Sequence, residues 1–567
     1  MSERLVVRGG LVVDGSGLPG FLADVEVVDG RIAAIGRVEG AGAEVVDADG
    51  LVVAPGFIDI HTHYDAQLQF EPTASPSSWH GVTTVAVGNC GFSLAPCHPA
   101  DVRWTLDMLS RVEGMSADAL AAGVSFGGGS MADFLAGLDG AVGVNVMAYA
   151  GHCALRRYVM GEAASEREAT AGEIADMQTL LRQCLADGAV GLSTSQLDIH
   201  VDHEGRPVPS NLASHAELEA LAAVLAEVAV GALEIFPRSF LPGVDEGDWE
   251  LLLRLAELSG KPVHGNVLGF FASAPDGWRR NLELAREARR RGLRYHPMLV
   301  LNPKGVHFSL DSTFIFDEYL TWRAVLTLSM PERMARLADP EVRAALAADL
   351  EGAGSLALQW QEVSVAATRD DANRGLIGRS IAQIAAERAG ADPLAVMIDL
   401  ALSEDLATMF AIRRDTVAAE RAVIDELVGD PLLMPGSSDG GAHLLTFCGA
   451  DYTTRLLTES VPGRLSLEQA VSRLTFAPAS TMGLWDRGLL RPGMAADLVL
   501  FDPDRLAVRP VRMVHDLPAG AGRLVFDAEG YVATIVNGRV LMRDGVATGE
   551  LPGQVLRAGA QGTTGSH

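Results

Sequence analysis

The sequence predicts an α/β protein: a (β/α)8 TIM-like barrel with a small β-sandwich domain formed from both chain ends. Three observations support this prediction. Helical segments alternate with short apolar runs in the middle of the chain, short strands broken by glycine turns fill its first part, and the same texture returns near its end. We therefore expect a barrel over residues 54–486, a composite β-domain from 1–53 and 487–550, and a disordered tail over 551–567.

The two ends of the chain show the pattern of antiparallel strands joined by tight turns. Asp29-Gly30 lies between two apolar runs, and Asn537-Gly538 lies between two more. Both dipeptides favour the two-residue turn of a β-hairpin. We expect the two ends to form one small domain, with the middle of the chain inserted between them.

The middle of the chain repeats helix–glycine–strand units. Thr170 and Glu173 form a capping box before a helix that ends near Gly188, and "AVGLSTS" then indicates a strand. Ser214 and Glu217 repeat this spacing. About eight such units fit a parallel barrel. Two doubly wound domains are the alternative, but no G-x-G-x-x-G or P-loop supports a nucleotide-binding version.

Composition narrows the classes of function. The formal charge of −28 argues against nucleic acid or an anionic membrane as a partner, because both are polyanions. No run approaches the ~20 apolar residues of a membrane helix, and the N-terminus lacks the regions of a signal peptide. Sparse cysteines without zinc-finger spacing indicate thiols in a reducing compartment, the cytoplasm. The oligomeric state stays open, a homo-oligomer included, and we expect residues 305–375 to form a lid or a subunit contact.

Two histidines end the first apolar run of the predicted barrel, in "GFIDIHTH". On a strand, Asp59, His61 and His63 share one face, which in a barrel points inward at the end where active sites lie. Cys90 ends the next apolar run and should emerge at the same end. Imidazole and thiolate are ligands that zinc prefers. Satisfied histidines and a buried structural cysteine are the alternative interpretation.

An acidic residue follows a late strand, in "GSSDGGAH". Asp439, held by this glycine-rich turn at the mouth of a barrel, could bind metal or transfer protons. A turn-forming aspartate is the alternative. The histidines His152, His200 and His443 follow apolar runs or motifs and are candidates for substrate binding, although each could be an ordinary polar loop residue.

Together these residues resemble the metal-dependent amidohydrolase superfamily, and within it the D-aminoacylase (N-acyl-D-amino-acid deacylase) family. The matching stretches are "APGFIDIHTHYD", "GNCGFSLAP", "GHCALRRYVMG", "GAVGLSTS", "GSSDGGAH" and "FAPASTMGLWDRGLLRPGMAADLVLFD". The resemblance implies a (β/α)8 barrel, zinc held by His61, His63 and Cys90, and Asp439 as the catalytic acid–base.

Two stretches depart from this family. The deacylases have a further histidine ligand in each, whereas this chain reads "VGALEIFPRSF", in which Glu234 could donate a carboxylate, and "GKPVHGNVL", in which His264 or Asn266 could face the site. The register is not settled by the sequence, and the number of ions, one or two, stays open. The only lysines, Lys261 and Lys304, are poorly placed to bridge two metals.

The function expected from these residues is zinc-dependent hydrolysis of a C–N amide bond, most simply in an N-acyl-D-amino acid, by metal-activated water with Asp439 as acid–base. Arg238 and Arg455 are available for the carboxylate of such a small-molecule substrate. Two alternatives remain. The same site could open a cyclic amide, imide, lactone or carbamate, or the chain could be a non-catalytic scaffold relative. No G-x-S-x-G motif supports a serine hydrolase.

Overall fold

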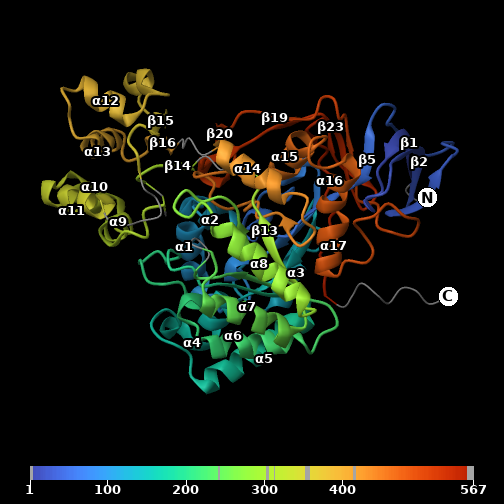
Figure 1. Cartoon of the computed structure of the whole chain (residues 1–567), viewed down its shortest axis with the longest axis horizontal. Helices are drawn as coiled ribbons and strands as arrows, with labels where there is room; N and C mark the ends of the chain where they lie inside the picture. Colours follow the sequence, from blue (N-terminus) through green and yellow to red (C-terminus); the bar gives the residue numbers. More distant parts are fainter. Residues whose placement is uncertain are drawn as a thin grey trace.

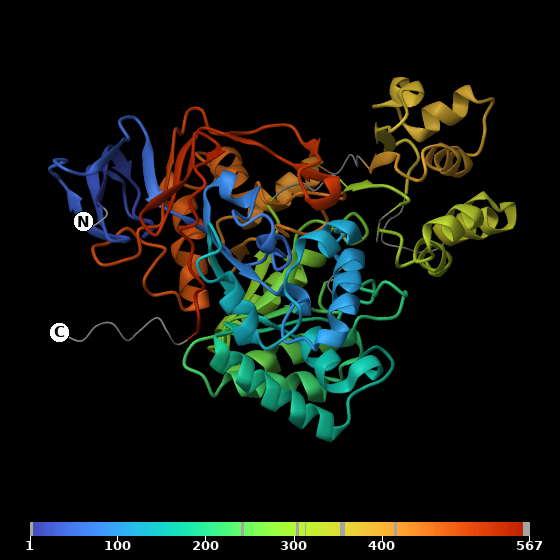
Figure 2. The ribbon, with the colours of Figure 1, turned by 180° about the vertical axis from the view of Figure 1, so that it is seen from behind.

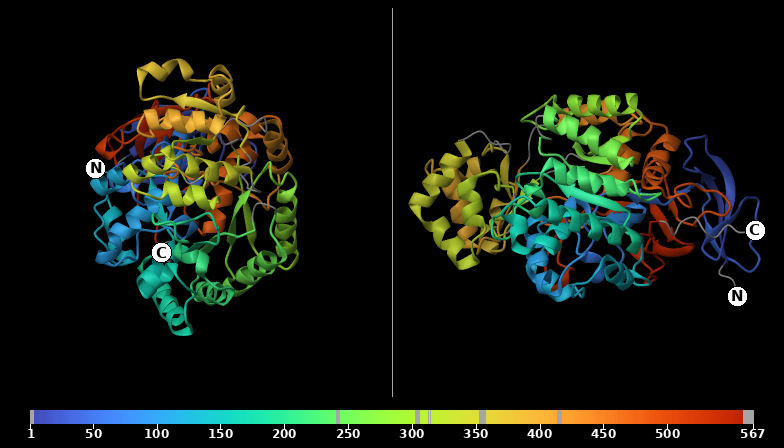
Figure 3. Two further views of the ribbon diagram at one scale, coloured as in Figure 1. Left: turned by 90° about the vertical axis from the view of Figure 1, so that its left-hand side faces the viewer. Right: turned by 90° about the horizontal axis from the view of Figure 1, so that it is seen from below.

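The computed structural model describes residues 4–239, 243–301, 306–311, 313, 315–351, 358–412 and 417–558. Figures 1, 2 and 3 show three bodies side by side. A central body of parallel strands and helices lies in the middle. A sheet built from both chain ends flanks it on one side, and a lobe of residues 306–412 stands out on the other.

The parallel strands of the central body form two sheets. Their bounds are β6 (Phe57–Asp59), β7 (Val82–Val87), β8 (Asn145–Ala148), β9 (Ala150–Gly151), β10 (Gly191–Ser195), β11 (Ala232–Phe236), β12 (Val263–Leu268), β13 (Tyr295–Leu299) and β17 (Met434–Pro435). One sheet has the order β6-β7-β8, the other β17-β13-β12-β11-β10-β9. All neighbours pair in parallel, as the alternation of helices and strands predicted.

Hydrogen bonds link the two sheets at both pairs of edges. The Tyr149 amide donates to the Val87 carbonyl, and the Val190 amide donates to the Ala148 carbonyl, so β8 and β9 continue one another. At the other edges, Thr62 after β6 pairs in parallel with Gly440 after β17. The carboxyl ends of the first and last strands are therefore neighbours.

The helices alternate with these strands and cover their outer side (Figure 1). Those of the central body are α1 (Val102–Val112), α2 (Ala117–Gly123), α3 (Met131–Leu138), α4 (His152–Met160), α5 (Ala171–Asp187), α6 (His215–Leu225), α7 (Glu246–Ser259), α8 (Gly277–Arg290), α14 (Val417–Leu427), α15 (Tyr452–Arg455), α16 (Leu467–Leu474) and α17 (Phe476–Met482). Within the described ranges no helix combines the length and the apolar character needed to cross a membrane.

The predicted helix caps are present, with one difference. Thr170 and Glu173 form a reciprocal capping box on α5, which ends at Gly188 in the left-handed conformation (φ 119°). Ser214 caps α6 by accepting the amide of Glu217. The Glu217 carboxylate does not return to Ser214, because it turns inward and pairs with two buried side chains described below.

Apolar side chains fill the space between the parallel strands. The cluster includes Ile58, Met147, Tyr149, Met298 and Met434, all nearly inaccessible to solvent. Ala479 and Met482 of α17 belong to the same cluster. This interior is packed rather than open, and the predicted metal-ligand residues lie beyond it, after the carboxyl ends of the strands.

Both chain ends contribute to one nine-stranded sheet of order β25-β24-β23-β18-β5-β1-β2-β3, with β4 paired to β1. Its strands are β1 (Arg4–Val12), β2 (Phe21–Val28), β3 (Arg31–Gly36), β4 (Glu44–Asp47), β5 (Val52–Pro55), β18 (Leu498–Phe501), β23 (Tyr531–Val536), β24 (Arg539–Arg543) and β25 (Val546–Ala547). Asp29-Gly30 and Asn537-Gly538 turn the two hairpins with positive φ at both residues. The packing of this sheet as a sandwich stays a prediction.

Part of the predicted 487–550 segment leaves this sheet for the central body. The short pairs β19 (Ala507–Val508) with β22 (Ala528–Glu529), and β20 (Arg512–Val514) with β21 (Arg523–Val525), lie between β18 and β23 in sequence. The Arg523 guanidinium donates to the Ser75 carbonyl (2.8 Å), and the Leu524 amide donates to the Leu444 carbonyl (2.7 Å). This stretch therefore contacts the loops after β6 and β17.

The lobe between β13 and β17 has its own hydrophobic core. It contains β14 (Val306–Phe308), β15 (Val363–Ala367), β16 (Met409–Ile412), α9 (Leu320–Leu326), α10 (Met330–Ala338), α11 (Pro340–Glu351), α12 (Ile381–Glu387) and α13 (Pro393–Ser403). Phe308, Phe316, Trp322 and Phe410 are buried at its centre. The expected lid or contact segment, 305–375, is thus part of a longer folded unit, and its role stays a prediction.

The C-terminal segment differs from the predicted tail in its first part. Residues 551–558 run along β8, where the Leu556 amide donates to the Val146 carbonyl and the Val146 amide donates to the Gln554 carbonyl. Leu556 packs against the interior cluster of the central body. The remainder of the predicted tail, 559–567, lies outside the described residues.

Candidate metal centre

Three side chains of metal-ligand type meet where the first two parallel strands end. His61 and His63 follow β6 and Cys90 follows β7, and their ligand atoms all lie within 4.8 Å of one another in a buried position. The Cys90 Sγ is 3.7 Å from the His61 Nε2. In a tetrahedral zinc site, with bonds of about 2.3 Å to sulfur and about 2.0 Å to nitrogen, these two ligand atoms lie about 3.6 Å apart. The donor set and its spacing fit zinc.

The backbone turn that carries Cys90 is tied to the histidine segment. Cys90 has a left-handed conformation (φ 54°) between Gly88 and Gly91, both also at positive φ. The Asn89 side-chain amide donates to the carbonyls of Thr62 (3.0 Å) and Ala86 (2.9 Å). Asn89 thereby fixes the cysteine turn relative to the residue between the two histidines.

Asp439 lies beside the same group, although it comes much later in the chain. Its Oδ1 is 3.2 Å from the His61 Nε2. The Ser438 hydroxyl donates to the His61 carbonyl (3.1 Å), and the His63 amide donates to the Gly440 carbonyl (2.7 Å). The Asp439 side chain is 13% exposed against 1% for His61, so Asp439 lies on the side of the group that opens to solvent.

Glu234 and Asn266 border His61 and Cys90 from the neighbouring strands. The Glu234 Oε2 accepts a hydrogen bond from the Cys90 amide (2.7 Å), and its Oε1 accepts one from the Asn266 side chain and lies 3.8 Å from the His61 Nδ1. On β12 the residue that reaches the site is therefore Asn266. His264, two positions earlier, is buried, and neither of its ring nitrogens has a hydrogen-bond partner among the residues that the structure describes.

Glu113 is a site residue that the sequence did not reveal. It follows α1, is buried, and places Oε1 3.2 Å from the His63 Nδ1 and Oε2 3.7 Å from the His443 Nε2. A histidine that binds a metal through one ring nitrogen commonly contacts a carboxylate through the other. No motif surrounds Glu113 in the stretch "RVEGM", and a buried acid after a helix has the same sequence signature as an exposed one.

The three histidines expected near the substrate have different surroundings. Both ring nitrogens of His152 are occupied, by Thr194 Oγ1 (2.9 Å) and Glu217 Oε1 (2.8 Å), so His152 belongs to a buried network. His200 contacts the Ser195 hydroxyl (2.9 Å), and its ring lies 5.3 Å edge-on from that of Phe92.

His443 lies beside Glu113 and packs its ring 4.6 Å from that of Phe447. Burial, with a further contribution from nearby His443, lowers the pKa of His200 to about 3. His443 and His200 also both contribute to the lowered pKa of His63, after burial and His61. These two histidines therefore belong to the surroundings of the metal group, whereas His152 does not.

Burial and mutual repulsion perturb the acids of this group. Burial raises the pKa of Asp59 and of Glu234 to about 7 each. Burial, followed by the charges of Glu234 and Glu113, raises the pKa of the Cys90 thiol well above its usual value. Burial disfavours the charged form of His61, but the hydrogen bond to Asp439 and the charge of Glu234 outweigh it, so the pKa of His61 is raised. Such a crowded set of buried acids is an environment that a divalent cation stabilises.

The cationic side chains lie farther out. The Arg238 guanidinium, in the loop after β11, donates to the carbonyls of Asn211 (2.8 Å) and Gln196 (3.3 Å). Arg455 is committed to ion pairs with Asp451 and Glu459. Lys261 lies at the amino end of β12, as expected, and Lys304 lies outside the described residues.

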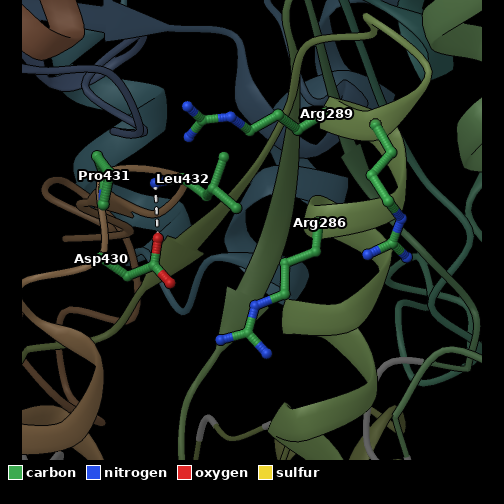
Figure 4. Close-up of a pocket in the computed structure, with 6 residues that line it drawn as sticks. Arg286, Arg289, Asp430, Pro431 and Leu432 are labelled. Atoms are coloured by element: carbon green, nitrogen blue, oxygen red, sulfur yellow. Dashed lines mark hydrogen bonds between the residues drawn. The ribbon is translucent and has the colours of Figure 1, made fainter.

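A separate hollow of about 670 Å³ lies at the opposite end of the strands (Figure 4). Its walls come from the end of α8 and from the loop before β17, and it is lined by Arg286, Arg289, Arg290, Asp430, Pro431 and Leu432. Both segments precede the amino ends of β13 and β17, whereas the metal group lies at the carboxyl ends. The arginine-rich stretch thus takes no part in the candidate metal centre.

Comparisons with known proteins find relatives that match most of the chain. A family model described as "Amidohydrolase family" matches residues 44–542. The chain is 30% identical to an N-acyl-D-aspartate deacylase of Alcaligenes xylosoxydans xylosoxydans, over 98% of this chain and 95% of that protein.

Two solved structures are similar over nearly the whole length. One is an N-acyl-D-glutamate deacylase from Bordetella bronchiseptica in complex with zinc and a phosphonate inhibitor, with 27% identity, a TM-score of 0.66 and coverage of 98% of this chain and 99% of that one. The other comes from work on the binuclear metal centre of D-aminoacylase, with 27% identity, a TM-score of 0.63 and the same coverage. The chain belongs to the amidohydrolase family.

Proposed function

We propose that this protein is a zinc-dependent hydrolase that removes the acyl group from N-acyl-D-amino acids. The observation that carries the proposal is the meeting of His61, His63, Cys90 and Asp439 at one end of the parallel strands. Relatives that cover almost the entire chain act on N-acyl-D-aspartate and N-acyl-D-glutamate by their names. The links at both pairs of sheet edges support closure of the two parallel sheets into one (β/α)8 barrel.

His61, His63 and Cys90 would hold the zinc ion. When bound, zinc polarises a carbonyl oxygen and lowers the pKa of water towards ~7, which makes a nucleophile available at neutral pH. The chain prepares its ligands for this. Glu113 faces the Nδ1 of His63 and leaves the other ring nitrogen for the ion, and Asn89 holds the cysteine turn in place.

Asp439 would move the proton. Water that attacks an amide carbonyl must lose a proton, and the departing nitrogen must gain one because an amine leaves poorly as an anion. Asp439 is the acid of this group on its solvent side, and its Oδ1 already lies within 3.2 Å of a metal-ligand nitrogen. It is therefore positioned to accept the proton of the water and to deliver it to the nitrogen of the amide.

The surroundings suggest how a substrate is held. His200 and His443 lie close enough to His63 to influence its pKa, and both are candidates to contact the acyl group of the substrate. Of the two arginines weighed for the substrate carboxylate, Arg238 is the better candidate. Its one acidic neighbour, Asp198, is exposed and lies 3.5 Å away, whereas Arg455 is bound to two acids at 2.6 and 2.8 Å. The cytoplasmic location, a homo-oligomeric state and a lid role for the lobe remain predictions.

The proposal is tested by incubating zinc-loaded protein with N-acetyl-D- and N-acetyl-L-amino acids, including D-aspartate and D-glutamate derivatives, beside hydantoins and lactones. We expect release of the free D-amino acid and a lower rate for the L-enantiomer. Turnover of hydantoins or lactones alone would support the cyclic-substrate alternative. Absence of bound zinc together with absence of any turnover would support the scaffold alternative.

A further inference from the structure

The inference concerns the number of metal ions, and it begins with the surroundings of the Asn266 side-chain nitrogen. Three atoms of metal-ligand type surround this Nδ2: the Glu234 Oε1, to which it donates a hydrogen bond, the His61 Nδ1 at 3.1 Å and the Cys90 Sγ at 3.8 Å. Oxygen, nitrogen and sulfur atoms around one point are the donor set of a metal ion. Here an amide group occupies that point.

Hydrogen bonds hold this arrangement in place. The Glu234 Oε2 accepts from the Cys90 amide (2.7 Å) while its Oε1 accepts from Asn266, so both carboxylate oxygens are satisfied by donors of the chain itself. The opposite orientation of the amide would turn its carbonyl oxygen against the Glu234 carboxylate, which is repulsive. The side chains of Cys90, Glu234 and Asn266 are all nearly inaccessible to solvent. Nothing in this arrangement requires an ion.

The two ring nitrogens of His61 face different sides. Its Nε2 faces the Cys90 Sγ (3.7 Å) and the Asp439 Oδ1 (3.2 Å). Its Nδ1 faces Asn266 and Glu234. On this side the Asn266 Nδ2 lies 3.1 Å from the Nδ1 and the Glu234 Oε1 lies 3.8 Å from it, so the amide and the carboxylate already occupy the space next to this nitrogen. One side of His61 thus suits a cation and the other suits a hydrogen-bonded pair.

We propose that the hydrogen-bonded pair of Asn266 and Glu234 fills the position of a second cation, so that this centre holds a single divalent ion. The proposal rests on the proposed function only in requiring that a metal binds at all. The solved D-aminoacylase structure is described by a binuclear metal centre with one-metal activation and second-metal attenuation. In this chain, side chains of the protein itself would occupy the second position. Asn266 is therefore a positioning residue that also excludes an ion.

The test counts metal ions in the full-length protein without any substrate. After equilibration with excess zinc and removal of free ions, elemental analysis is expected to give about one zinc ion per chain. Asn266→His replaces the amide by an imidazole beside Glu234 and Cys90, so this variant is expected to hold about two. His264→Asn, a change of the same residue types two positions earlier on the same strand, serves as the matched control and should leave the count at about one.

The possible results distinguish failure of the single-ion inference from failure of the proposed function. Two ions in the unaltered protein would overturn the inference, and so would a folded Asn266→His variant that still binds one. A protein that binds no ion would instead contradict the proposed function. Should Asn266→His fail to fold, cobalt titration of the unaltered protein replaces it: a paramagnetic signal that stops rising after one equivalent supports the single site, and loss of signal through spin coupling at a second equivalent contradicts it.

Discussion

Replacing Asp439 by asparagine tests the proton-transfer role of this carboxylate while the turn that carries it is kept. The two side chains have the same shape, and asparagine tolerates the left-handed backbone that Asp439 adopts (φ 52°). The Ser438 and Gly440 contacts that hold this turn do not involve the Asp439 carboxylate. The substitution thus removes the negative charge and the proton acceptor while the turn should keep its conformation.

The expected loss follows from the role assigned to this carboxylate. Transfer of a proton by a positioned acid–base group contributes about 10²–10⁴-fold to a rate. At 1.36 kcal/mol for each factor of ten, this corresponds to roughly 3–5 kcal/mol in the activation free energy. We expect Asp439→Asn to lower kcat by this factor, to change KM little, and to retain zinc on His61, His63 and Cys90.

Steady-state kinetics on the best N-acetyl-D-amino acid, with zinc counted in the same samples, provide the assay. Asp430→Asn is the matched control, because Asp430 precedes the same strand at its other end and its bond to the Leu432 amide can be kept by an asparagine oxygen. A zinc-loaded Asp439→Asn enzyme with near-normal kcat would refute the proton-transfer role. Loss of zinc from this variant would make Asp439 a metal ligand instead.

Three further outcomes follow from the same geometry. Removal of zinc by a chelator should abolish activity, and zinc should restore it; activity that survives complete removal, verified by elemental analysis, would contradict a metal mechanism. Glu113→Gln removes the carboxylate facing His63 and should weaken zinc binding about 10–100-fold, measured by competition with a chromogenic chelator, and unchanged affinity would exclude a positioning role. Glu217→Gln leaves buried Arg156 without its charged partner and should cost about 3–5 kcal/mol of unfolding free energy. Glu219→Gln on the same helix should cost little, because the Glu219 side chain is partly exposed and its ion pair with half-exposed Arg254 is long, at 3.6 Å. Burial opposes ionisation of Glu217, but its hydrogen bonds outweigh burial and lower its pKa. The ionised carboxylate therefore stabilises the fold above the unfolded-state pKa of about 4.3, and this stabilisation is lost as the pH falls below that value. A difference in melting temperature between the unaltered protein and Glu217→Gln that grows in acid would contradict this.

The metal group is the part of the site that the sequence makes most visible. The alternation of a strand predicted that His61 and His63 share a face and that Cys90 ends the next strand. In the structure β6 ends at Asp59 and β7 at Val87, so all three residues lie in the turns just beyond the strand ends, where they still meet. Parallel neighbours end at one edge, which is why residues distant in sequence could be expected to meet. Asp439 could be anticipated for the same reason, because it follows β17.

Alternation along a strand predicts which face a residue lies on, but not how far along the strand the site lies. His264 and Asn266 occupy the same face of β12, and only the end of the strand decides which of them reaches the site. A histidine is the more familiar ligand, yet Asn266 is the residue beside His61. Glu217 poses the same difficulty: its spacing from Ser214 is that of a capping box, but a buried arginine competes for its carboxylate. Partners brought in from distant segments decide both cases, and local patterns carry no information about them.

Two larger differences between prediction and structure, in the lobe and in the C-terminal segment, also come from long-range packing. The lobe of residues 306–412 could not be told from a long loop region, because its core residues pack only on one another. The tail was predicted from the small and polar residues 559–567, but residues 551–558 before them include Leu551, Val555 and Leu556. Leu556 packs against the central body, and the backbone of this segment forms hydrogen bonds with β8. Composition predicts how a segment behaves alone, and here a neighbouring strand edge changes the outcome.

Backbone conformation ties these observations to function. Cys90, Ser437, Asp439 and His443 all adopt positive φ, where a residue with a side chain costs about 1–3 kcal/mol. Strand and helix patterns end at these positions because the chain there satisfies the geometry of a site rather than local preference. The hydrogen bonds from the Asn89 side chain to the carbonyls of Thr62, between the two histidines, and of Ala86, on β7, help to offset that cost. A glycine at Cys90 would relieve the backbone but remove the sulfur, so the presence of cysteine at a strained turn is best explained by what its side chain binds.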